Sequence, residues 1–418
     1  MPHILDLRRG ADLPPFPPPA LDESVLVTVR RIIEDVRARG DQALAELTLR
    51  HDGADVTGGI RVPDEEVRAA TIEPPLERAL ERMADRLRDL HGRQVPQGWT
   101  GERDGIRFGE VVRPLAAVGC YVPGGRAAYP STALMTAIPA RVAGVDRVAV
   151  ATPPGADGSV APAVLVAARV AGVDEVYRLG GAQAVAALAL GTATVARVDK
   201  IVGPGNAWVT AAKRELAGVV GIDGLAGPTE LVVVAGPGAD PGVVAVDLVA
   251  QAEHDPQARA VLLCTDPALA RDVERALASE AASSPRGDVV RAALAHAVLA
   301  VCDEDRAAGL VDRLAPEHLQ VLMPDPEGFL GRVRSFGAAF LGPHTPVSFG
   351  DYGVGSNHVL PTMATARFAS GLRAADMVTI SSFVEASAEG SAAVGPEVEL
   401  VASAEGLPGH ARAAEVRR

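Results

Sequence analysis

Cysteine is scarce in this chain of 418 residues, and the three that occur lie far apart, at Cys120, Cys264 and Cys302. No two of them form a C-x-x-C pair, which excludes a disulfide framework and a cysteine-rich zinc module. Cys264 and Cys302 lie in apolar, strand-like runs, so we expect both thiols to be buried. This usage is typical of a protein from a reducing compartment.

Long hydrophobic runs are also lacking. No segment reaches the ~18 uninterrupted apolar residues that a membrane-spanning helix needs, and the first ten residues, MPHILDLRRG, have neither the hydrophobic region nor the cleavage site of a leader. We therefore expect a cytoplasmic protein with no membrane partner. The formal net charge is -13, with acidic and basic residues interspersed, which argues against a nucleic-acid or anionic-membrane surface. Small molecules are the expected partners.

The third absence is the G-x-G-x-x-G string of ordinary dinucleotide-binding domains. Two other glycine-containing junctions between a predicted strand and a predicted helix are present, residues 179–183 (LGGAQ) and residues 202–206 (VGPGN). Glycine there lets the backbone approach a ligand, and the amino terminus of the following helix favours an anion. Such junctions are also ordinary turns of α/β folds, so they leave nucleotide binding open.

Strand and helix patterns alternate from residue 122 to 223 and again from 231 to 341, with short loops between them. This alternation predicts two α/β units with parallel sheets, and the length of the chain also exceeds what one core usually organises. The first 20 residues end in the proline-rich stretch PPFPPPA and are expected to form an extended arm. Residues 375–418 are predicted to be a polar, helical tail that must pack elsewhere because it has few large apolar side chains.

The stretch from Ile222 to His254 has the residues most typical of a reactive site. Its last part, from Asp247 to His254, lacks glycine and proline, so a helix is predicted that presents Gln251 and His254 on one face. Imidazole is the most common protein donor to zinc, and a carboxamide oxygen is a weak, neutral donor. A pair of this kind is also common on ordinary helix surfaces, so alone it does not establish a metal site.

Four segments of this stretch, in this order and spacing, resemble the signature of histidinol dehydrogenases: Ile222–Asp223, Ala226–Glu230, Asp247–Leu248 and Gln251–His254. The similarity extends from Tyr121 to His410. It implies an α/β fold with two Rossmann-like domains, one inserted in the other, in a homodimer whose active sites are shared. The expected parts are an N-terminal arm (1–20), a main α/β domain with the zinc and substrate site (21–118 and 230–374), an inserted NAD-contacting domain (119–229) and a helical C-terminal tail (375–418) that is exchanged between subunits.

The resemblance also implies two cofactors, Zn²⁺ and NAD. The implied zinc ligands are Gln251, His254, Asp351 and His410, which form a mixed nitrogen and oxygen donor set. The implied NAD contacts are Tyr121, Gln183 and Asn206. Without their motifs, Asp351 would be an ordinary loop residue and His410 an ordinary tail residue, so their value lies in joint occurrence.

The activity implied by the resemblance is the oxidation of L-histidinol through L-histidinal to L-histidine in two NAD-dependent steps. His318 is implied as the general base and its neighbour Glu317 as the residue that activates water in the second step. The family often has serine where this chain has Thr229, which keeps the hydroxyl and adds a methyl group. The implied substrate contacts are Thr229, Gln251, His254, His318, Asp351, His358, Glu405 and His410.

Two alternatives remain at this point. A related zinc and NAD dehydrogenase could use the same scaffold on another polar alcohol, such as sulfopropanediol. Glu405 and His410 favour a substrate with amino and imidazole groups. A zinc-binding protein without catalysis is the second alternative, and the presence of both Glu317 and His318 argues against it.

Overall fold

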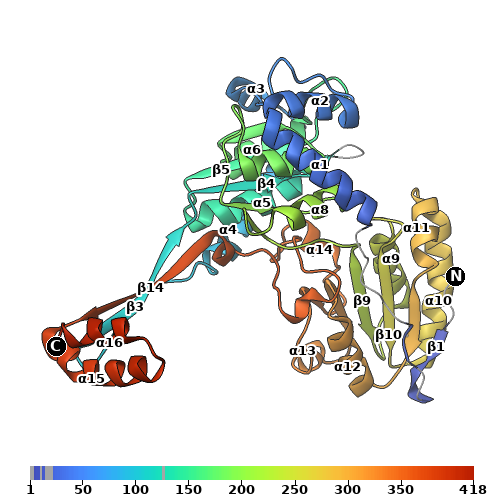
Figure 1. The fold of residues 1–418 in the computed structure, drawn as a ribbon. Helices are drawn as coiled ribbons and strands as arrows, with labels where there is room; N and C mark the ends of the chain where they lie inside the picture. The colour runs from blue at the N-terminus through green and yellow to red at the C-terminus, as the bar shows by residue number, and fades with distance from the viewer. Residues whose placement is uncertain (1–3, 10–11, 15–21, 125–127) are drawn as a thin grey trace.

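The computed structural model describes residues 4–9, 12–14, 22–124 and 128–418, which form two parallel sheets and one small antiparallel sheet (Figure 1). The first parallel sheet has the strand order β6-β5-β4-β7-β8. Its strands are β4 (Ala117–Tyr121), β5 (Arg147–Thr152), β6 (Glu175–Arg178), β7 (Lys200–Val202) and β8 (Gly221–Ile222). The helices between them are α5 (Pro130–Ala143), α6 (Pro162–Ala171), α7 (Gly181–Leu190) and α8 (Ala207–Leu216).

The second parallel sheet has the order β1-β11-β10-β9-β12-β13. Its strands are β1 (Ile4–Asp6), β9 (Glu230–Ala235), β10 (Arg259–Cys264), β11 (Val298–Val301), β12 (His318–Leu322) and β13 (Ala338–Leu341). Its helices are α9 (Pro241–Ala252), α10 (Pro267–Ser283), α11 (Gly287–Leu294), α12 (Glu304–Leu314) and α13 (Pro326–Leu330). In both sheets the first strand of the βα run lies between the second and the fourth, as in dinucleotide-binding folds. The predicted α/β class with parallel sheets is confirmed.

The N-terminal helices cover the first sheet. They are α1 (Glu23–Arg39), α2 (Asp41–Asp52), α3 (Asp64–Ala69) and α4 (Pro74–Gly92). Leu44 of α2 shares a core with side chains of α7 and α8, whereas Leu87 of α4 shares a core with α5 and α6. Residues 21–118 were expected to belong to one domain with residues 230–374, whereas α1, α2 and α4 pack on the first sheet. The apolar stripes of α1 and α4 are buried against opposite faces of the first sheet, because a parallel sheet needs cover on both faces.

The beginning of the chain joins the other sheet. Strand β1 pairs in parallel with β11, and Leu7 and Leu13 are buried in the core beneath α12. The expected arm therefore contributes an edge strand to the second sheet over these residues. The proline-rich part of the arm, residues 15–20, lies outside the described residues.

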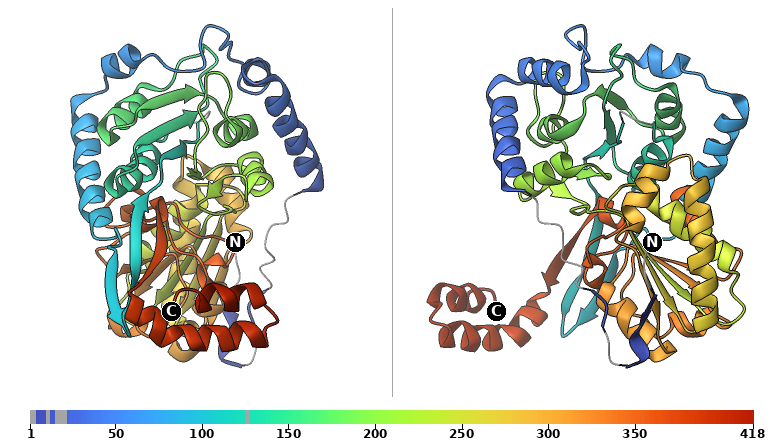
Figure 2. Two further views of the ribbon diagram at one scale, coloured as in Figure 1. Left: turned by 60° about the vertical axis from the view of Figure 1, so that its left-hand side comes forward. Right: turned by 90° about the vertical axis from the view of Figure 1, so that its right-hand side faces the viewer.

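The antiparallel sheet carries the end of the chain. It consists of β2 (Trp99–Arg103), β3 (Ile106–Pro114) and β14 (Val378–Ala386), in the order β14-β3-β2, followed by α15 (Ala388–Ala404) and α16 (Pro408–Glu415). We call this unit the projecting arm, because β3 and β14 extend away from the two sheets with α15 and α16 at the tip (Figures 1 and 2). The tail was expected to be helical throughout, and its first part is a strand instead. This strand has no buried apolar face of alternating residues, so its pairing with β3 alone defines it as a strand.

Residues 342–377 connect the second sheet to the projecting arm and pass between the two sheets. They include α14 (Ser348–Asp351) and the short 3₁₀ turns Thr365–Arg367 and Ala374–Met377. Arg86 of α4 donates to the carbonyl of Gly353 at 3.1 Å, and Lys200 of β7 donates to the carbonyl of Asp376 at 2.8 Å. This bridging segment is therefore anchored to the first domain although it follows the second.

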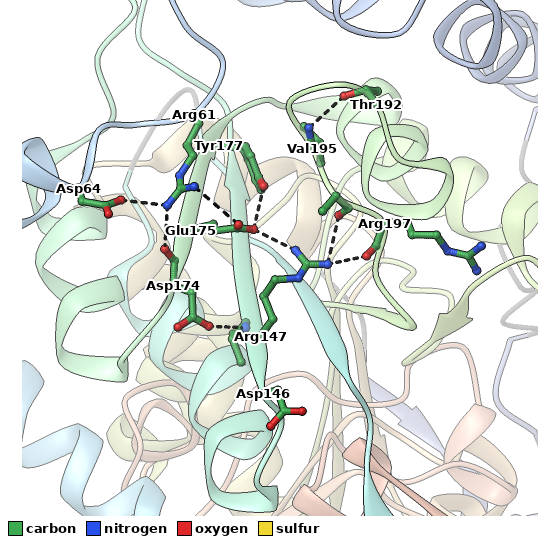
Figure 3. A network of polar contacts seen from close by, with 12 residues as sticks. Arg61, Asp64, Asp146, Arg147, Asp174, Glu175, Tyr177, Thr192, Val195 and Arg197 are labelled. Carbon is green, nitrogen blue, oxygen red and sulfur yellow. Dashed lines mark hydrogen bonds and ion pairs between the residues drawn. The ribbon is translucent and has the colours of Figure 1, made fainter.

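A polar network closes the amino ends of β5 and β6 (Figure 3). The Glu175 carboxylate accepts hydrogen bonds from Arg147 at 2.9 Å and from the Tyr177 hydroxyl at 2.8 Å. Arg61 approaches the same carboxylate at 3.8 Å. This end of the first sheet is thus occupied by ion pairs between its own residues. Over the described residues, no helix has the length and apolarity to cross a membrane.

Candidate active site

Glu317 and His318 lie where β12 begins, beside the beginning of β9. The helix α12 ends at Leu314, the capping residue Ala315 has a left-handed backbone (φ 43°), and Pro316 then leads the chain into the strand. The Glu317 carboxylate is buried and accepts hydrogen bonds from the Thr229 hydroxyl at 2.6 Å and from the Glu230 backbone N–H at 2.9 Å. The structure therefore brings Thr229 and Glu317 together.

The tautomer of His318 follows from its partner. Its Nδ1 lies 3.1 Å from the Glu230 carbonyl oxygen, which can only accept, so Nδ1 carries the proton. Its Nε2 is buried and has no hydrogen-bond partner among the described residues. Nδ1 also lies 3.6 Å from the Glu317 carboxylate. A histidine held in this way presents an unprotonated Nε2 to its surroundings, as a general base requires.

Gln251 is oriented by the same hydrogen-bond chain. It is buried on the last turn of α9, and its Nε2 donates to the Thr229 hydroxyl oxygen at 2.6 Å. Its carbonyl oxygen makes no hydrogen bond with the described residues and is therefore available as a donor to a cation. The predicted helix ends at Ala252, so the exposed His254 lies in the following turn, where its backbone N–H is 3.4 Å from the backbone carbonyl oxygen of Gln251. The prediction that one helix includes both Gln251 and His254 was wrong, because His254 lies beyond the end of the helix.

The bridging segment supplies Asp351 and His358. The His358 ring donates from Nδ1 to the Asp351 carbonyl at 3.3 Å, and its Nε2 accepts from the Thr132 hydroxyl at 3.1 Å. Burial lowers the pKa of His358, Asp351 opposes this shift, and the nearby imidazoles of His318 and His254 add to it. These four side chains therefore occupy one neighbourhood between the two sheets. Both ring nitrogens of His358 are engaged, so its direct contact with substrate remains a prediction.

Two residues that the sequence analysis did not single out hold this segment in place. Asn357 is buried and donates to the Met135 carbonyl at 2.7 Å, and it lies 3.3 Å from Nε2 of the fully buried His91. His91 in turn contacts Gln94 through Nδ1 at 2.8 Å. In the sequence, a histidine beside the apolar stripe of α4 could have indicated that His91 is a buried polar residue with a structural role. These contacts fix the position of the neighbouring His358.

The donors in this region are of the types that zinc accepts. Gln251 offers a free carbonyl oxygen, His254 an imidazole and Asp351 a carboxylate. Among the residues that the structure describes, no three His, Cys, Asp or Glu side chains converge into a complete cation site. The donor chemistry fits Zn²⁺.

Within one chain, Glu405 and His410 lie on the projecting arm and not beside Gln251, His254 and Asp351. Both are exposed on the projecting arm, Glu405 just after α15 and His410 on α16. Helices α15 and α16 pack on each other beyond β14 (Figure 1). The single chain therefore presents these two side chains to its exterior.

The expected NAD contacts lie at the carboxyl ends of strands of the first sheet. Tyr121 ends β4 and is buried; burial raises the pKa of its hydroxyl to about 12, and its oxygen accepts from the Gly181 N–H at 3.1 Å. Gln183 is buried in the first turn of α7. Asn206 caps α8 by accepting from the N–H groups of Trp208 and Val209. The expected stacking face of Tyr121 is thus packed in the core, and Asn206 keeps only its amide N–H groups for a ligand.

Asp223 from the signature stretch has a structural role at this junction. Its carboxylate accepts from the Gly203 N–H at 2.6 Å and pairs with the buried Lys213 ammonium at 2.6 Å. Lys213 also donates to the Gly203 carbonyl at 2.5 Å. This buried ion pair fixes the glycine junction that leads into Asn206.

Comparison with known proteins decides the family of the chain. A sequence model of the family described as "Histidinol dehydrogenase" matches residues 19–418. The chain belongs to the histidinol dehydrogenase family. It is 48% identical to the histidinol dehydrogenase of Caulobacter vibrioides, over 99% of this chain and 95% of that protein. It is 46% identical to that of Nitrobacter winogradskyi over the whole of both chains.

A solved structure agrees. The histidinol dehydrogenase of Elizabethkingia anophelis superposes with a TM-score of 0.91 at 34% sequence identity, covering 97% of this chain and 93% of that one. The histidinol dehydrogenase resemblance inferred from the signature is therefore confirmed. The individual site residues remain predictions, supported by the contacts described above.

We expect the hydroxyl group of Thr229 to be required for full activity and its methyl group to be dispensable. Thr229→Val removes the donor to Glu317 and the acceptor for Gln251, and a hydrogen bond to a charged group contributes about 1.5–3 kcal/mol. We expect kcat for alcohol oxidation to fall about 10- to 100-fold. Thr229→Ser keeps the hydroxyl and serves as the matched control, with kcat within about threefold of the parent chain. Equal activity of the valine and serine variants in steady-state assays would contradict this role.

Proposed function

We propose that the protein oxidises L-histidinol through L-histidinal to L-histidine, with NAD as the hydride acceptor and Zn²⁺ in the site. The observation that supports this most directly is the arrangement of Glu317 and His318 at the beginning of β12. One presents a free imidazole nitrogen, and the other is a carboxylate with one oxygen held and the other free of hydrogen bonds among the described residues. Family membership supplies the substrate, and this pair supplies the chemistry.

His318 accepts the proton of the substrate hydroxyl through Nε2. Its Nδ1–H is fixed on the Glu230 carbonyl, which keeps the ring in the tautomer that has a basic Nε2. As hydride leaves the carbinol carbon, removal of the hydroxyl proton completes the oxidation to the aldehyde. The same nitrogen accepts the proton of the aldehyde hydrate in the second oxidation.

Glu317 activates the water that adds to the aldehyde. Its Oε2 accepts from Thr229 and Glu230, so the carboxylate cannot rotate, and Oε1 remains for a water molecule. Burial at 7% exposure reduces competition from bulk solvent. A carboxylate positioned in this way takes a proton from the attacking water.

Zinc would be held by the Gln251 carbonyl oxygen, His254 and Asp351, with His410 as the fourth ligand. When bound, the ion supplies a Lewis-acidic centre that holds the amino and imidazole nitrogens of the substrate and so positions its carbinol carbon. The hydrogen bond from Gln251 to Thr229 aims the carbonyl oxygen away from Thr229 and makes it available to the ion. Glu405 and His358 complete the proposed substrate contacts.

NAD would bind along the carboxyl ends of β4 and β7, where Tyr121 and Asn206 lie, and beside the first turn of α7, which carries Gln183. The strand order reverses between β4 and β7, and ligands of open α/β sheets bind at such a reversal. The amide N–H groups of Asn206 and the first turn of α7 offer the donors. A cytoplasmic location also remains a prediction.

His410 is proposed to ligate the zinc of a second copy of the chain. The projecting arm exposes large apolar side chains, with Leu400 at 73%, Val401 at 59% and Val384 at 72% exposure. Contiguous exposed apolar residues on an element without a core mark an interface. A two-fold homodimer that exchanges these arms covers them and completes each site with Glu405 and His410 of the other subunit.

Turnover of a small panel of alcohols tests the function. With purified protein and NAD, histidinol and histidinal should both reduce NAD, and sulfopropanediol should not. The protein should carry about one zinc per subunit, because one donor set is present, and chelation should abolish turnover. Turnover of the sulfonated diol alone would assign the scaffold to the other alcohol. Native turnover by protein shown by elemental analysis to be metal-free would contradict the zinc site.

The two oxidations should respond differently to loss of Glu317. Glu317→Gln removes the base for water but keeps the hydrogen bonds from Thr229 and Glu230. We expect about a 10²- to 10⁴-fold loss in histidinal oxidation and a clearly smaller loss in the first step. His318→Asn should reduce both steps. Single-turnover assays from each starting compound measure this, and equal losses for Glu317→Gln would leave that residue only an orienting role.

Mixing two inactive variants tests the exchanged arm. His318→Asn and His410→Asn proteins are unfolded together and refolded, so that half of the dimers contain one chain of each. If His410 serves the partner, one site of each heterodimer collects both lesions and the other collects none. Roughly a quarter of all sites should then recover full activity, given a closed two-fold dimer. Absence of activity in demonstrably heterodimeric protein would show that His410 serves its own chain.

A further inference from the structure

Glu230 touches both catalytic residues through its backbone, while its side chain lies on the other face of the sheet. Its N–H donates to Glu317 at 2.9 Å and its carbonyl accepts from His318 at 3.1 Å. Side chains alternate along β9, so Glu230 faces the same way as Val232, in the core beneath α12. A single peptide unit on each side of one α-carbon thus connects the proposed catalytic pair to the reverse face of the sheet.

The Glu230 carboxylate is buried at 7% exposure and anchored at both oxygens. Oε1 lies 3.2 Å from Nη1 of Arg259, and Oε2 accepts from the Met363 N–H at 3.2 Å. Met363 belongs to the bridging segment that carries His358, and its backbone is left-handed (φ 56°). The anchor therefore ties the first residue of β9 to the neighbouring strand and to the segment between the sheets.

A second contact holds the same two segments together. The Gly227 N–H donates to the Thr362 hydroxyl at 2.7 Å. A Cβ atom at position 227 would lie 2.5 Å from Cγ of Met363, so only glycine permits this approach. The close fit leaves the Met363 N–H no freedom to follow a shortened side chain at position 230.

The charges around Glu230 come from four elements. Arg259 lies at the start of β10, Arg313 on α12 and Arg367 on the bridging segment, and all three line a cavity of about 260 Å³ with Glu230. Glu317 approaches from the start of β12. Burial raises the pKa of Glu230 to about 7; Arg259 opposes the shift and Glu317 adds to it.

We propose that Glu230 is a positioning residue for the reaction: its anchored carboxylate fixes the two peptide groups that orient Glu317 and His318. This inference rests on the proposed function. It requires that the length of the side chain, which allows the carboxylate to contact both Arg259 and Met363, has a larger effect on kcat than its charge. A displacement of the catalytic pair by about 1 Å is enough to cost about 100-fold in rate.

Two single variants separate reach from charge. Glu230→Asp keeps the carboxylate but shortens the side chain by one methylene group, so both anchors are lost. Glu230→Gln keeps the length and an acceptor for the Met363 N–H but removes the charge. We expect Glu230→Asp to lower kcat of both oxidations about 10- to 100-fold, and Glu230→Gln to stay within about threefold of the parent. The KM for NAD should not change in either variant, because the proposed NAD contacts lie on the first sheet.

Glu175→Gln is the matched control, since it removes another largely buried, arginine-paired carboxylate at the start of a strand, in the first sheet (Figure 3). Its kcat should stay within about twofold of the parent. A folded, dimeric Glu230→Asp protein with parental kcat would overturn the inference, and so would equal losses in the Asp and Gln variants. If the parent protein fails to oxidise histidinol, the proposed function fails instead, so the two failures are distinguishable.

The pH dependence of stability provides a readout independent of turnover. The folded-state pKa of Glu230 is about 7, above the ordinary value of 4.5, so the folded state binds this proton more tightly than the unfolded state. This contribution to stability is complete below pH ~4.5 and is lost as the pH rises through about 7. Glu230→Gln should therefore lose less stability than the parent between pH 5.5 and pH 8.5 in denaturant titrations. An unchanged pH dependence would show that the carboxylate is not held in the buried, anchored position.

Discussion

The first residues of β9 and β12 must satisfy one another's hydrogen bonds, and the chemistry of the site depends on how they do so. Glu317 is a buried carboxylate, which is costly unless donors surround it. The Thr229 hydroxyl gives its proton to Glu317, so toward Gln251 it can only accept. Gln251 must then present its amide N–H to Thr229, which leaves its carbonyl oxygen free. One desolvated carboxylate thereby orients a proposed zinc ligand two side chains away.

The two parallel sheets share one strand order but use opposite edges. In the first sheet, Arg147 and Glu175 close the amino ends of β5 and β6, and the proposed NAD contacts lie at carboxyl ends. In the second sheet, the proposed catalytic pair lies at the amino ends of β9 and β12. The general rule for open α/β sheets places ligands at carboxyl ends, so a substrate site at the amino edge of the second sheet would depart from that rule. Residues 342–377 run between the sheets (Figure 1), so His358 contacts Thr132 of α5 while the imidazole of His318, at the amino edge of the second sheet, lies near it.

Local patterns predicted the regular part of the fold, and long-range pairing decided the rest. Strands such as β10 and helices such as α10 belong to the βα alternation that is visible in the sequence from residue 231 to 341. Strand β14 was missed because only its pairing with β3 defines it. The site followed the same division. Glu317 and Thr229 could be predicted from motifs, whereas the anchoring roles of Glu230 and Asn357 exist only as tertiary contacts.

The projecting arm connects metal binding to assembly. In one chain the proposed zinc donors Gln251, His254 and Asp351 lie away from the tail, while His410, the proposed fourth donor, is exposed on the projecting arm. Under the exchanged-arm proposal, burial of Leu400 and Val401 against the second subunit and ligation by His410 occur in the same event. Zinc then binds the dimer more tightly than the separated chains, and by linkage the ion stabilises the dimer by the same free energy. The apolar surface of the arm and its single imidazole would thus be selected together, since neither functions without the other.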